Sequence, residues 1–277
     1  MSTRRNAEIA RWLLESRTDT VQASIITGLP VRELELLASA AEKNFRRVLL
    51  PTDVTIAVAA LAAVKGKIKV VQVGANDGKT GDPVFGVIQR YAQTALLIEP
   101  QSALIDRLRA NYADFQGQAI IERSAVGPNR GELTLHCVAP AYHEAYWSKV
   151  GRDPTQIASV NRAQVLRRVG PRLGLSGADA EEAVITDIVP TVPLSELCAR
   201  HGLTEIDFLQ VDCEGYDMQV LLSLGALRPA VINFESMNLS KEDWALFLSW
   251  AKENDYGFIQ GAQDTLAIRH FDGRHPL

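Results

Sequence analysis

The chain has 277 residues, a mass of 30.4 kDa, a formal net charge of −4 and a pI near 5.8. An acidic chain of ordinary composition does not favour binding of a long nucleic acid through bulk electrostatics. The three cysteines are scattered along the chain, which argues against a zinc site and predicts a reducing compartment.

No apolar segment suggests attachment to a membrane. The longest apolar run, at 54–64, is shorter than the roughly 20 residues that a spanning helix needs. The N-terminal residues are too charged for the core of a signal peptide. We therefore expect a cytoplasmic protein.

The first 65 residues predict a helical extension. Apolar residues recur at helical spacing from Val31 to Leu49, after a shorter amphipathic helix. The stretch at 20–40 also has the pattern of a helix–turn–helix that would read DNA. The acidic charge instead favours a helical cap or a surface that joins two copies as a homodimer.

From Lys67 onward, strands and helices alternate, which predicts an α/β domain over 66–277 with a doubly wound parallel sheet. An irregular insert with little strand character interrupts the pattern at about 139–185. We expect Asp82 to cap the helix at 83–92, Ser240 to open the last helix, and 256–260 to pair with 265–269 as an antiparallel hairpin. The other expected strands are 68–73, 94–98, 119–126, 132–138, 206–212 and 230–235, and the other expected helices are 102–112, 192–202 and 216–225.

A glycine loop, GANDG at 74–78, directly follows the first of these strands. Gly74 and Gly78 permit a positive φ and a close approach of the backbone to a ligand. The next strand ends at Glu99, where a carboxylate accepts hydrogen bonds from a ribose diol in dinucleotide-binding folds. Together, the loop and the acid predict a cofactor that contains a nucleoside.

The loop lacks the G-x-G-x-x-G pattern of dinucleotide sites and carries Asp77. A carboxylate there repels a pyrophosphate and tolerates the sulfonium and ammonium of S-adenosylmethionine, so we favour this donor over NAD. Three alternatives stay open: a plain glycine turn, an NAD-dependent reductase or epimerase, and a non-catalytic nucleoside-binding module that acts through its helical N-terminus.

Four segments carry a resemblance to a known family. VVQVGANDGKTGDPV, LLIEPQ, ERSAVG and IDFLQVDCEGYDMQVL…INFE, in this order, resemble the FkbM family of S-adenosylmethionine-dependent methyltransferases over about 67–236. The D-x-E-G block at 212–215 is the most specific element. The resemblance implies a Rossmann-like class I methyltransferase sheet and transfer of a methyl group to a hydroxyl of a small molecule, often a sugar. Many members have a lysine where this chain has Gln210.

The resemblance also implies roles for single residues. Glu99 would hold the ribose hydroxyls, and Asp212 would face the methionine ammonium or the acceptor. The loop residues Gly74, Ala75, Asn76, Asp77 and Gly78 would line the methionine part of the donor, and Pro100, Gln101, Ser124 and Ala125 would lie beside the adenine.

The chemistry of transfer calls for a group that takes a proton from the acceptor hydroxyl. Asp212, Glu214 and Glu235 follow two neighbouring strands and are candidates for this base, for a Mg²⁺ or Ca²⁺ site, or for structural hydrogen bonding. His143 is another candidate base. It lies in an aromatic cluster that either stacks on a sugar ring or anchors the insert: Tyr142, Tyr146 and Trp147.

The insert also holds a local run of arginines, which fits either a solvated helix face or a clamp for a phosphate or carboxylate on the acceptor. Its members are Arg162, Arg167, Arg168 and Arg172.

Overall fold

The computed structural model describes residues 53–269. The helices expected before Pro51, and the homodimer expected through them, lie outside the described residues. The boundary expected at 65 separates α4 (Asp53–Lys65) from the first strand, although α4 packs against that strand in one apolar core.

A central sheet of seven strands runs through the domain in the order β3-β2-β1-β7-β8-β10-β9. Neighbours from β3 to β8 are parallel, and β10 is antiparallel to both β8 and β9. This arrangement confirms the predicted doubly wound α/β fold and the predicted hairpin. The strands are β1 (Ile68–Val73), β2 (Ala92–Ile98), β3 (Gln118–Glu122), β7 (Phe208–Val211), β8 (Val231–Glu235), β9 (Tyr256–Gln260) and β10 (Asp264–Arg269).

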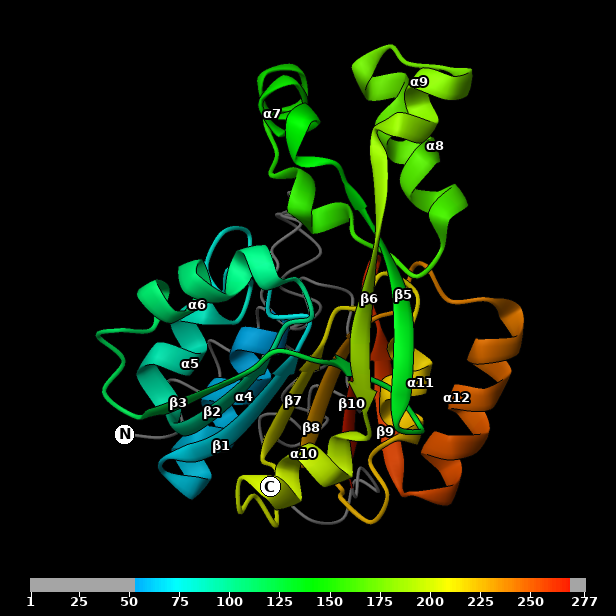
Figure 1. Cartoon of the computed structure of the whole chain (residues 1–277). Helices are drawn as coiled ribbons and strands as arrows, with labels where there is room; N and C mark the ends of the chain where they lie inside the picture. Colours follow the sequence, from blue (N-terminus) through cyan, green and yellow to red (C-terminus); the bar gives the residue numbers. More distant parts are fainter. Residues whose placement is uncertain (1–52, 270–277) are drawn as a thin grey trace, which may run out of the picture.

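Helices cover both faces of this sheet (Figure 1). In β1, Val70 packs into the core on one face and Val71 into the core on the other, and both are fully buried. Burial on both faces explains why the central strands are continuously apolar. One core includes α4, α5 (Phe85–Tyr91) and α6 (Ile105–Asn111), and the other includes α10 (Leu194–Arg200), α11 (Asp217–Leu222) and α12 (Lys241–Glu253).

A long antiparallel ribbon joins the sheet to the insert, which stands at the top of Figure 1. The ribbon consists of β5 (Gly131–Val138) and β6 (Val184–Val192), and β4 (Ala125–Val126) pairs with the lower end of β6. Between β5 and β6 the insert packs around an apolar core of its own that includes Tyr146 and Val165. Its elements are η2 (Pro140–Tyr142), α7 (His143–Val150), η3 (Pro154–Ile157), α8 (Arg162–Leu173) and α9 (Gly177–Glu182).

Three elements differ from the sequence-based predictions. The strand expected at 119–126 divides, because β3 ends at Glu122 and the next two strand residues join β6 in a second sheet. The expectation that Asp82 caps a helix from 83 is wrong, since α5 begins at Phe85 after Val84. Asp82 instead accepts hydrogen bonds from the Val84 N–H and the Gln72 side chain. β6 has no counterpart among the predicted strands.

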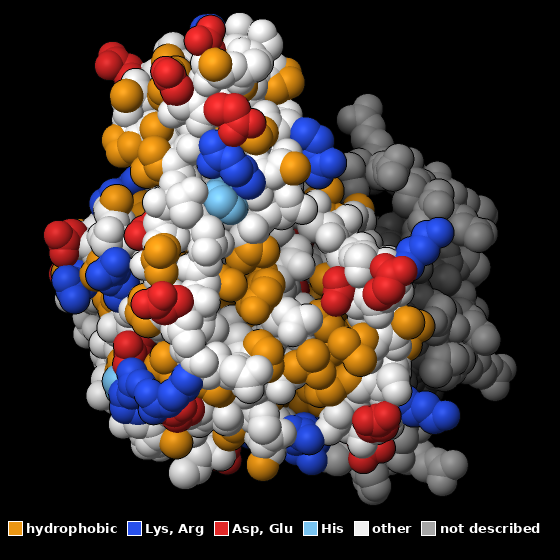
Figure 2. Space-filling view, turned by 45° about the vertical axis from the view of Figure 1, so that its right-hand side comes forward, with side chains coloured by type: hydrophobic (Ala, Val, Ile, Leu, Met, Phe, Trp, Pro, Cys, Tyr) orange, Lys and Arg blue, Asp and Glu red, His pale blue; other side chains and the backbone are white. Residues whose placement is uncertain are grey.

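Turning the molecule brings another face forward, on which hydrophobic side chains gather in the middle and lower part and charged side chains lie around them (Figure 2). Exposed large apolar residues include Leu246 and Leu248 of α12 and Ile188 of β6. Within residues 53–269, no helix combines the length and the apolar character that crossing a bilayer requires.

Candidate functional site

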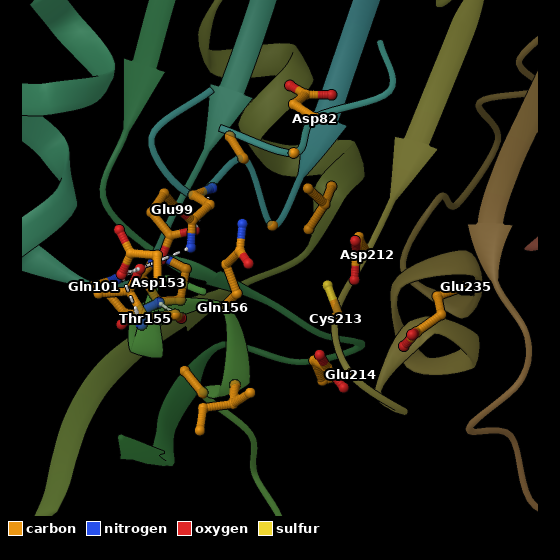
Figure 3. Close-up of a pocket in the computed structure, with 18 of the residues that line it drawn as sticks. Asp82, Glu99, Gln101, Asp153, Thr155, Gln156, Asp212, Cys213, Glu214 and Glu235 are labelled. Atoms are coloured by element: carbon orange, nitrogen blue, oxygen red, sulfur yellow. Dashed lines mark hydrogen bonds between the residues drawn. The ribbon is translucent and has the colours of Figure 1, made fainter. Parts of the chain in front are cut away.

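A cavity of about 780 Å³ lies where β1, β2, β7 and β8 end and the insert faces the sheet. Its walls include residues that follow each of these strands and residues of α7, η3 and α8. The strand order reverses between β1 and β7, the place where open α/β sheets bind ligands. In Figure 3, Glu99, Gln101 and Thr155 form one group, and Asp212, Glu214 and Glu235 lie on the other side.

The two glycines of the loop after β1 are required by protein packing. Gly74 has a φ of +78°, and a Cβ there would lie 1.9 Å from the backbone oxygen of Asp212. Gly78 has a φ of +70°, and a Cβ there would lie 2.4 Å from Cδ1 of Leu108. Gly74 thus lets the loop touch the chain after β7, and Gly78 lets it touch α6.

Asp77 is not part of the cavity wall. Its side chain is buried and accepts hydrogen bonds from Thr80 and from the Lys79 backbone N–H. It also forms an ion pair with Arg107, in which a guanidinium nitrogen lies 2.7 Å from Oδ2. Burial alone would raise the pKa of Asp77, but these hydrogen bonds and the charge of Arg107 hold it below its ordinary value. Asp77 and Gly78 do not line the cavity, so this geometry gives no support to the expectation that Asp77 meets the donor's cation.

Glu99 is buried in the cavity wall with 3% of its surface exposed. Its two carboxylate oxygens accept the backbone N–H groups of Asn76, at 2.8 Å, and Gln101, at 2.9 Å. Asn76 has a φ of +50°, so these bonds also hold the loop in a conformation that non-glycine residues rarely adopt. Burial raises the pKa of Glu99 above its ordinary value, against the effect of the two N–H groups.

Nine of the eleven cofactor residues that the sequence predicts line this one cavity. They are Gly74, Ala75, Asn76, Glu99, Pro100, Gln101, Ser124, Ala125 and Asp212. Within the described part of the chain, two buried atoms of the cavity wall lack a hydrogen-bond partner: Ser124 Oγ and Gln72 Oε1. Buried polar atoms without partners are rare, so both mark a place for a polar ligand.

Carboxyl groups gather at the other end of the cavity (Figure 3). Burial and the neighbouring charge of Glu214 raise the pKa of Glu235 to about 7. Asp212 lines the cavity and is exposed by its surface area, although protein surrounds it on the other sides. Desolvation by this protein, followed by the charge of Glu235 and other acids, raises the pKa of Asp212 above its ordinary value.

The insert contributes a wall that the sequence did not reveal. Thr155 of η3 receives hydrogen bonds from the side chains of Gln101, at 3.2 Å, and Asn76, at 3.4 Å. Gln156 donates to the backbone oxygen of Thr80 at 2.9 Å. These contacts join the insert to the glycine loop, and the D-P-T sequence that begins η3 gave no signal of them.

His143 does not reach the cavity. Its Nε2 atom lies 3.0 Å from the backbone oxygen of Val138, and the residue is absent from the cavity wall. The prediction of His143 as a base therefore has no support from this geometry. Its neighbours Tyr146 and Trp147 do line the cavity.

The four arginines of the insert divide into two pairs. Arg168 and Arg172 line the cavity, whereas Arg162 and Arg167 do not. Arg162 forms an ion pair with Glu181 on the insert itself. Of the four arginines predicted as a clamp, two therefore line the cavity. Arg152 is a third arginine in the cavity wall.

No group of three or more histidine, cysteine, aspartate or glutamate side chains within 53–269 is arranged to hold a metal ion. Asp212, Glu214 and Glu235 line one end of the cavity without forming such a group, so their interpretation as a metal site lacks support.

Comparison with known proteins gives one family. A model of the "Methyltransferase FkbM domain" matches residues 72–265. No curated protein matches the chain by sequence.

Two solved structures illustrate more distant similarity. The methyltransferase FkbM from Methylobacillus flagellatus KT is 14% identical with a TM-score of 0.46, and the match covers 95% of this chain and 59% of that chain. The O-methyltransferase from Bacillus cereus in complex with SAH is 11% identical with a TM-score of 0.40, with coverage of 92% and 98%. This chain therefore spans little more than half of the first protein, and neither likeness carries an argument about a substrate.

Proposed function

Because this chain belongs to the FkbM methyltransferase family, we propose that it transfers a methyl group from S-adenosylmethionine to a hydroxyl oxygen of a small molecule, a sugar or a glycosylated metabolite. The observation that carries the proposal is one cavity at the switch point of the sheet, with a buried glutamate at one end and several carboxyls at the other. The family match includes both ends of this cavity.

The nucleoside end fits the sugar and base of the donor. Glu99 keeps acceptor capacity on both oxygens after binding two N–H groups, enough for a ribose diol. Ser124 Oγ supplies a hydrogen-bonding atom without a protein partner, as an adenine edge requires. Pro100, Gln101 and Ala125 would flank the base.

The opposite end fits a cation. Asp212, Glu214 and Glu235 line this end. Over the whole cavity, acidic residues outnumber basic ones by six to three. The acidic residues are Asp82, Glu99, Asp153, Asp212, Glu214 and Glu235, and the basic residues are Arg152, Arg168 and Arg172. When bound, the donor supplies a methyl group on a positively charged sulfur. An acidic cavity suits this sulfonium and the methionine ammonium, and disfavours the pyrophosphate of NAD. Asp212, Glu214 and Glu235 supply the negative charge at this end of the cavity, and Asp77 does not.

Glu235 is the proposed proton acceptor. As the new oxygen–carbon bond forms and the sulfur–carbon bond breaks, the hydroxyl proton passes to this carboxylate. A pKa of about 7 leaves a substantial deprotonated fraction at neutral pH and makes the group a strong base when ionised. Asp212 would orient the methionine ammonium or the acceptor, while Glu214 is bound by Arg168 at 2.6 Å.

The insert would bind the acceptor. Trp147 lines the cavity with 54% of its surface exposed, and offers an aromatic face to a sugar ring. Arg172 donates to the Tyr146 hydroxyl at 2.7 Å and keeps further N–H groups. Together with Arg152, it supports an acceptor that carries an anionic group.

Calorimetry with S-adenosylhomocysteine tests the donor site without knowledge of the acceptor. We expect the wild-type protein to bind this product and not NAD. Glu99→Gln should weaken binding about 10-fold or more, because an amide cannot accept on both of its ends. Glu122→Ala is the matched control, since Glu122 lies outside the cavity and pairs with Arg200 and His201.

Absence of uptake by the wild-type protein, or undiminished uptake by Glu99→Gln, would overturn the proposed donor site. Uptake of S-adenosylhomocysteine without methylation of any acceptor in a panel of sugars and sugar phosphates would favour the non-catalytic nucleoside-binding module.

A further inference from the structure

One arginine of the insert reaches the carboxyl groups at the edge of the sheet. An Arg168 guanidinium nitrogen lies 2.6 Å from Oε2 of Glu214, and the two side chains are 26% and 16% exposed. Arg168 comes from α8, whereas Glu214 follows β7. The ion pair therefore joins two parts of the fold that meet at the cavity.

Other groups of the insert converge on the same residue. Gln164 Nε2 lies 3.4 Å from the Glu214 carboxylate, and Ser159 Oγ lies 3.4 Å from the Glu214 backbone oxygen. Glu214 has a φ of +51°, in the left-handed region. A non-glycine residue keeps that conformation where its surroundings hold it, and here the insert supplies contacts to both its side chain and its backbone.

Asn238 extends this network to the proposed base. Its Nδ2 donates to Oε2 of Glu235 at 2.8 Å and to Oε2 of Glu214 at 3.3 Å. One amide thus bridges two carboxylates, a geometry that like charges oppose unless a cation lies beside them. Arg168 supplies that cation, and it contacts the same Glu214 oxygen as Asn238, Oε2.

Apart from Arg168, the charged groups that interact electrostatically with Glu235 are all acidic. They are Asp212 and Glu214 after β7, Asp217 of α11 and Asp264 of β10, whereas Arg168 belongs to α8. Burial and Glu214 raise the pKa of Glu235, while Asn238 and Arg168 lower it. Arg168 is the cation in this set, and it belongs to the insert.

We propose that Arg168 is a positioning residue, which through Glu214 and Asn238 holds Glu235 in its working orientation and charge, so that the proton-accepting site is complete only with the insert seated on the sheet. The proposal rests on the proposed function of Glu235 as base. Its test nevertheless measures Glu235 directly and needs neither the donor nor the acceptor.

The experiment follows the Glu235 carboxyl by NMR titration of ¹³C-glutamate-labelled protein, assigned with Glu235→Gln. In Arg168→Ala we expect the midpoint to rise by about 1 unit above the wild-type value, because an attractive charge is lost. Arg168→Lys keeps the charge and should restore most of the shift. Thermal unfolding of each variant verifies that the labelled protein is folded.

Glu181→Gln is the matched control. It breaks the ion pair of Arg162 with Glu181, a second arginine–glutamate pair of the same insert, which lies outside the cavity wall. We expect the Glu235 midpoint of this variant to equal that of the wild type. If the Glu235 midpoint shifted as much in Glu181→Gln as in Arg168→Ala, the shift would come from a general loosening of the insert. That result would overturn the proposal.

A folded Arg168→Ala protein in which Glu235 titrates as in the wild type would also overturn it. Failure of S-adenosylhomocysteine to bind would instead remove the proposed methyl transfer and leave the measured coupling between Arg168 and Glu235 standing.

Discussion

Glu235 and Asp217 belong to one group of acids, and the pKa of each is raised to about 7, with burial as the largest cause. Asp217 is fully buried, and its carboxylate accepts the backbone N–H groups of Cys213 and Gly215. Glu235 instead lines the cavity and keeps one side-chain donor, Asn238. The first holds the D-x-E-G loop in shape, and the second is accessible to a substrate.

This difference predicts the effect of Glu235→Gln. The variant should lose about 10²–10³ in kcat, because the amide cannot accept a proton from the hydroxyl. Wild-type activity should rise with pH through about 7 as Glu235 ionises, and this limb should be absent from the variant. Steady-state kinetics against pH measure both effects.

Glu253→Gln, on α12, provides the control, and S-adenosylhomocysteine should bind Glu235→Gln as it binds the wild type. If Glu235→Gln kept full activity, Glu235 would be excluded as the base, and Asp212 would become the candidate to test.

Many residues of the cavity wall could be predicted from the sequence, but the orientation of their side chains could not. Asp77 and Glu99 both follow a buried strand, yet Glu99 lines the cavity and Asp77 does not. Lys79 and Thr80 of the same loop hold the Asp77 carboxylate, and Arg107 of α6 pairs with it. The contact with Arg107 is tertiary, so the local pattern around GANDG carries no trace of that part.

At the scale of whole elements, burial explains which strands the sequence revealed. β1 and β2 are apolar on both faces and were predicted almost to the residue. β6 alternates poorly, exposes Ile185 and Ile188, and contains Pro190. Its partner is mainly β5, and its buried apolar residues, Val184, Val189 and Val192, do not follow the alternation of a strand.

The helices of the insert carry the proposed contacts to the acceptor. Replacing Arg152 and Arg172 together with alanine should raise the acceptor KM about 10-fold or more and leave the affinity for S-adenosylhomocysteine unchanged, because a charge-assisted hydrogen bond contributes about 1.5–3 kcal/mol. Kinetics with an acceptor found in the panel, together with calorimetry, separate the two effects.

Arg167→Ala serves as the comparison, since Arg167 belongs to the same basic run but lies outside the cavity wall. An unchanged KM in the double variant would mean that the acceptor carries no anion recognised by these arginines.

At the scale of the molecule, the acids at the sheet edge should cost stability when they ionise. Asp217 and Glu235 have a pKa raised to about 7, above the values near 4 of an unfolded chain. Between these values the folded state binds more protons than the unfolded state, so the free energy of unfolding should fall as pH rises from about 4 to 7. The loss from these two groups continues through pH 7 and levels off as both become fully ionised above it.

Urea unfolding at pH 5.5 and pH 8 measures this dependence, for which we expect a fall of a few kcal/mol. The lowered pKa values of Asp77 and Asp153 act in the opposite direction but only near pH 4 and below. Asp217→Asn should flatten the dependence, whereas stability that rises between these two pH values would contradict the account.

The doubly wound parallel sheet could be predicted from the sequence because most of its strands are followed by a helix signal of their own. The relation of the insert to the sheet could not, because it depends on contacts such as that of Arg168 with Glu214, 46 positions apart in the chain. The homodimer expected through the helices before Pro51 stays a prediction.

The ribbon that supports the insert has a consequence for engineering. At its upper end Val138 pairs with Val184, and the Ala139 N–H donates to the oxygen of Ala183, so the chain leaves and re-enters at neighbouring points. A cap that leaves and re-enters through one such rung can be exchanged between related scaffolds if it keeps the contacts of Thr155 with Asn76 and Gln101. Recombination at this junction would change acceptor choice, and the chemistry beneath would survive where the new cap also supplies a cation to Glu214.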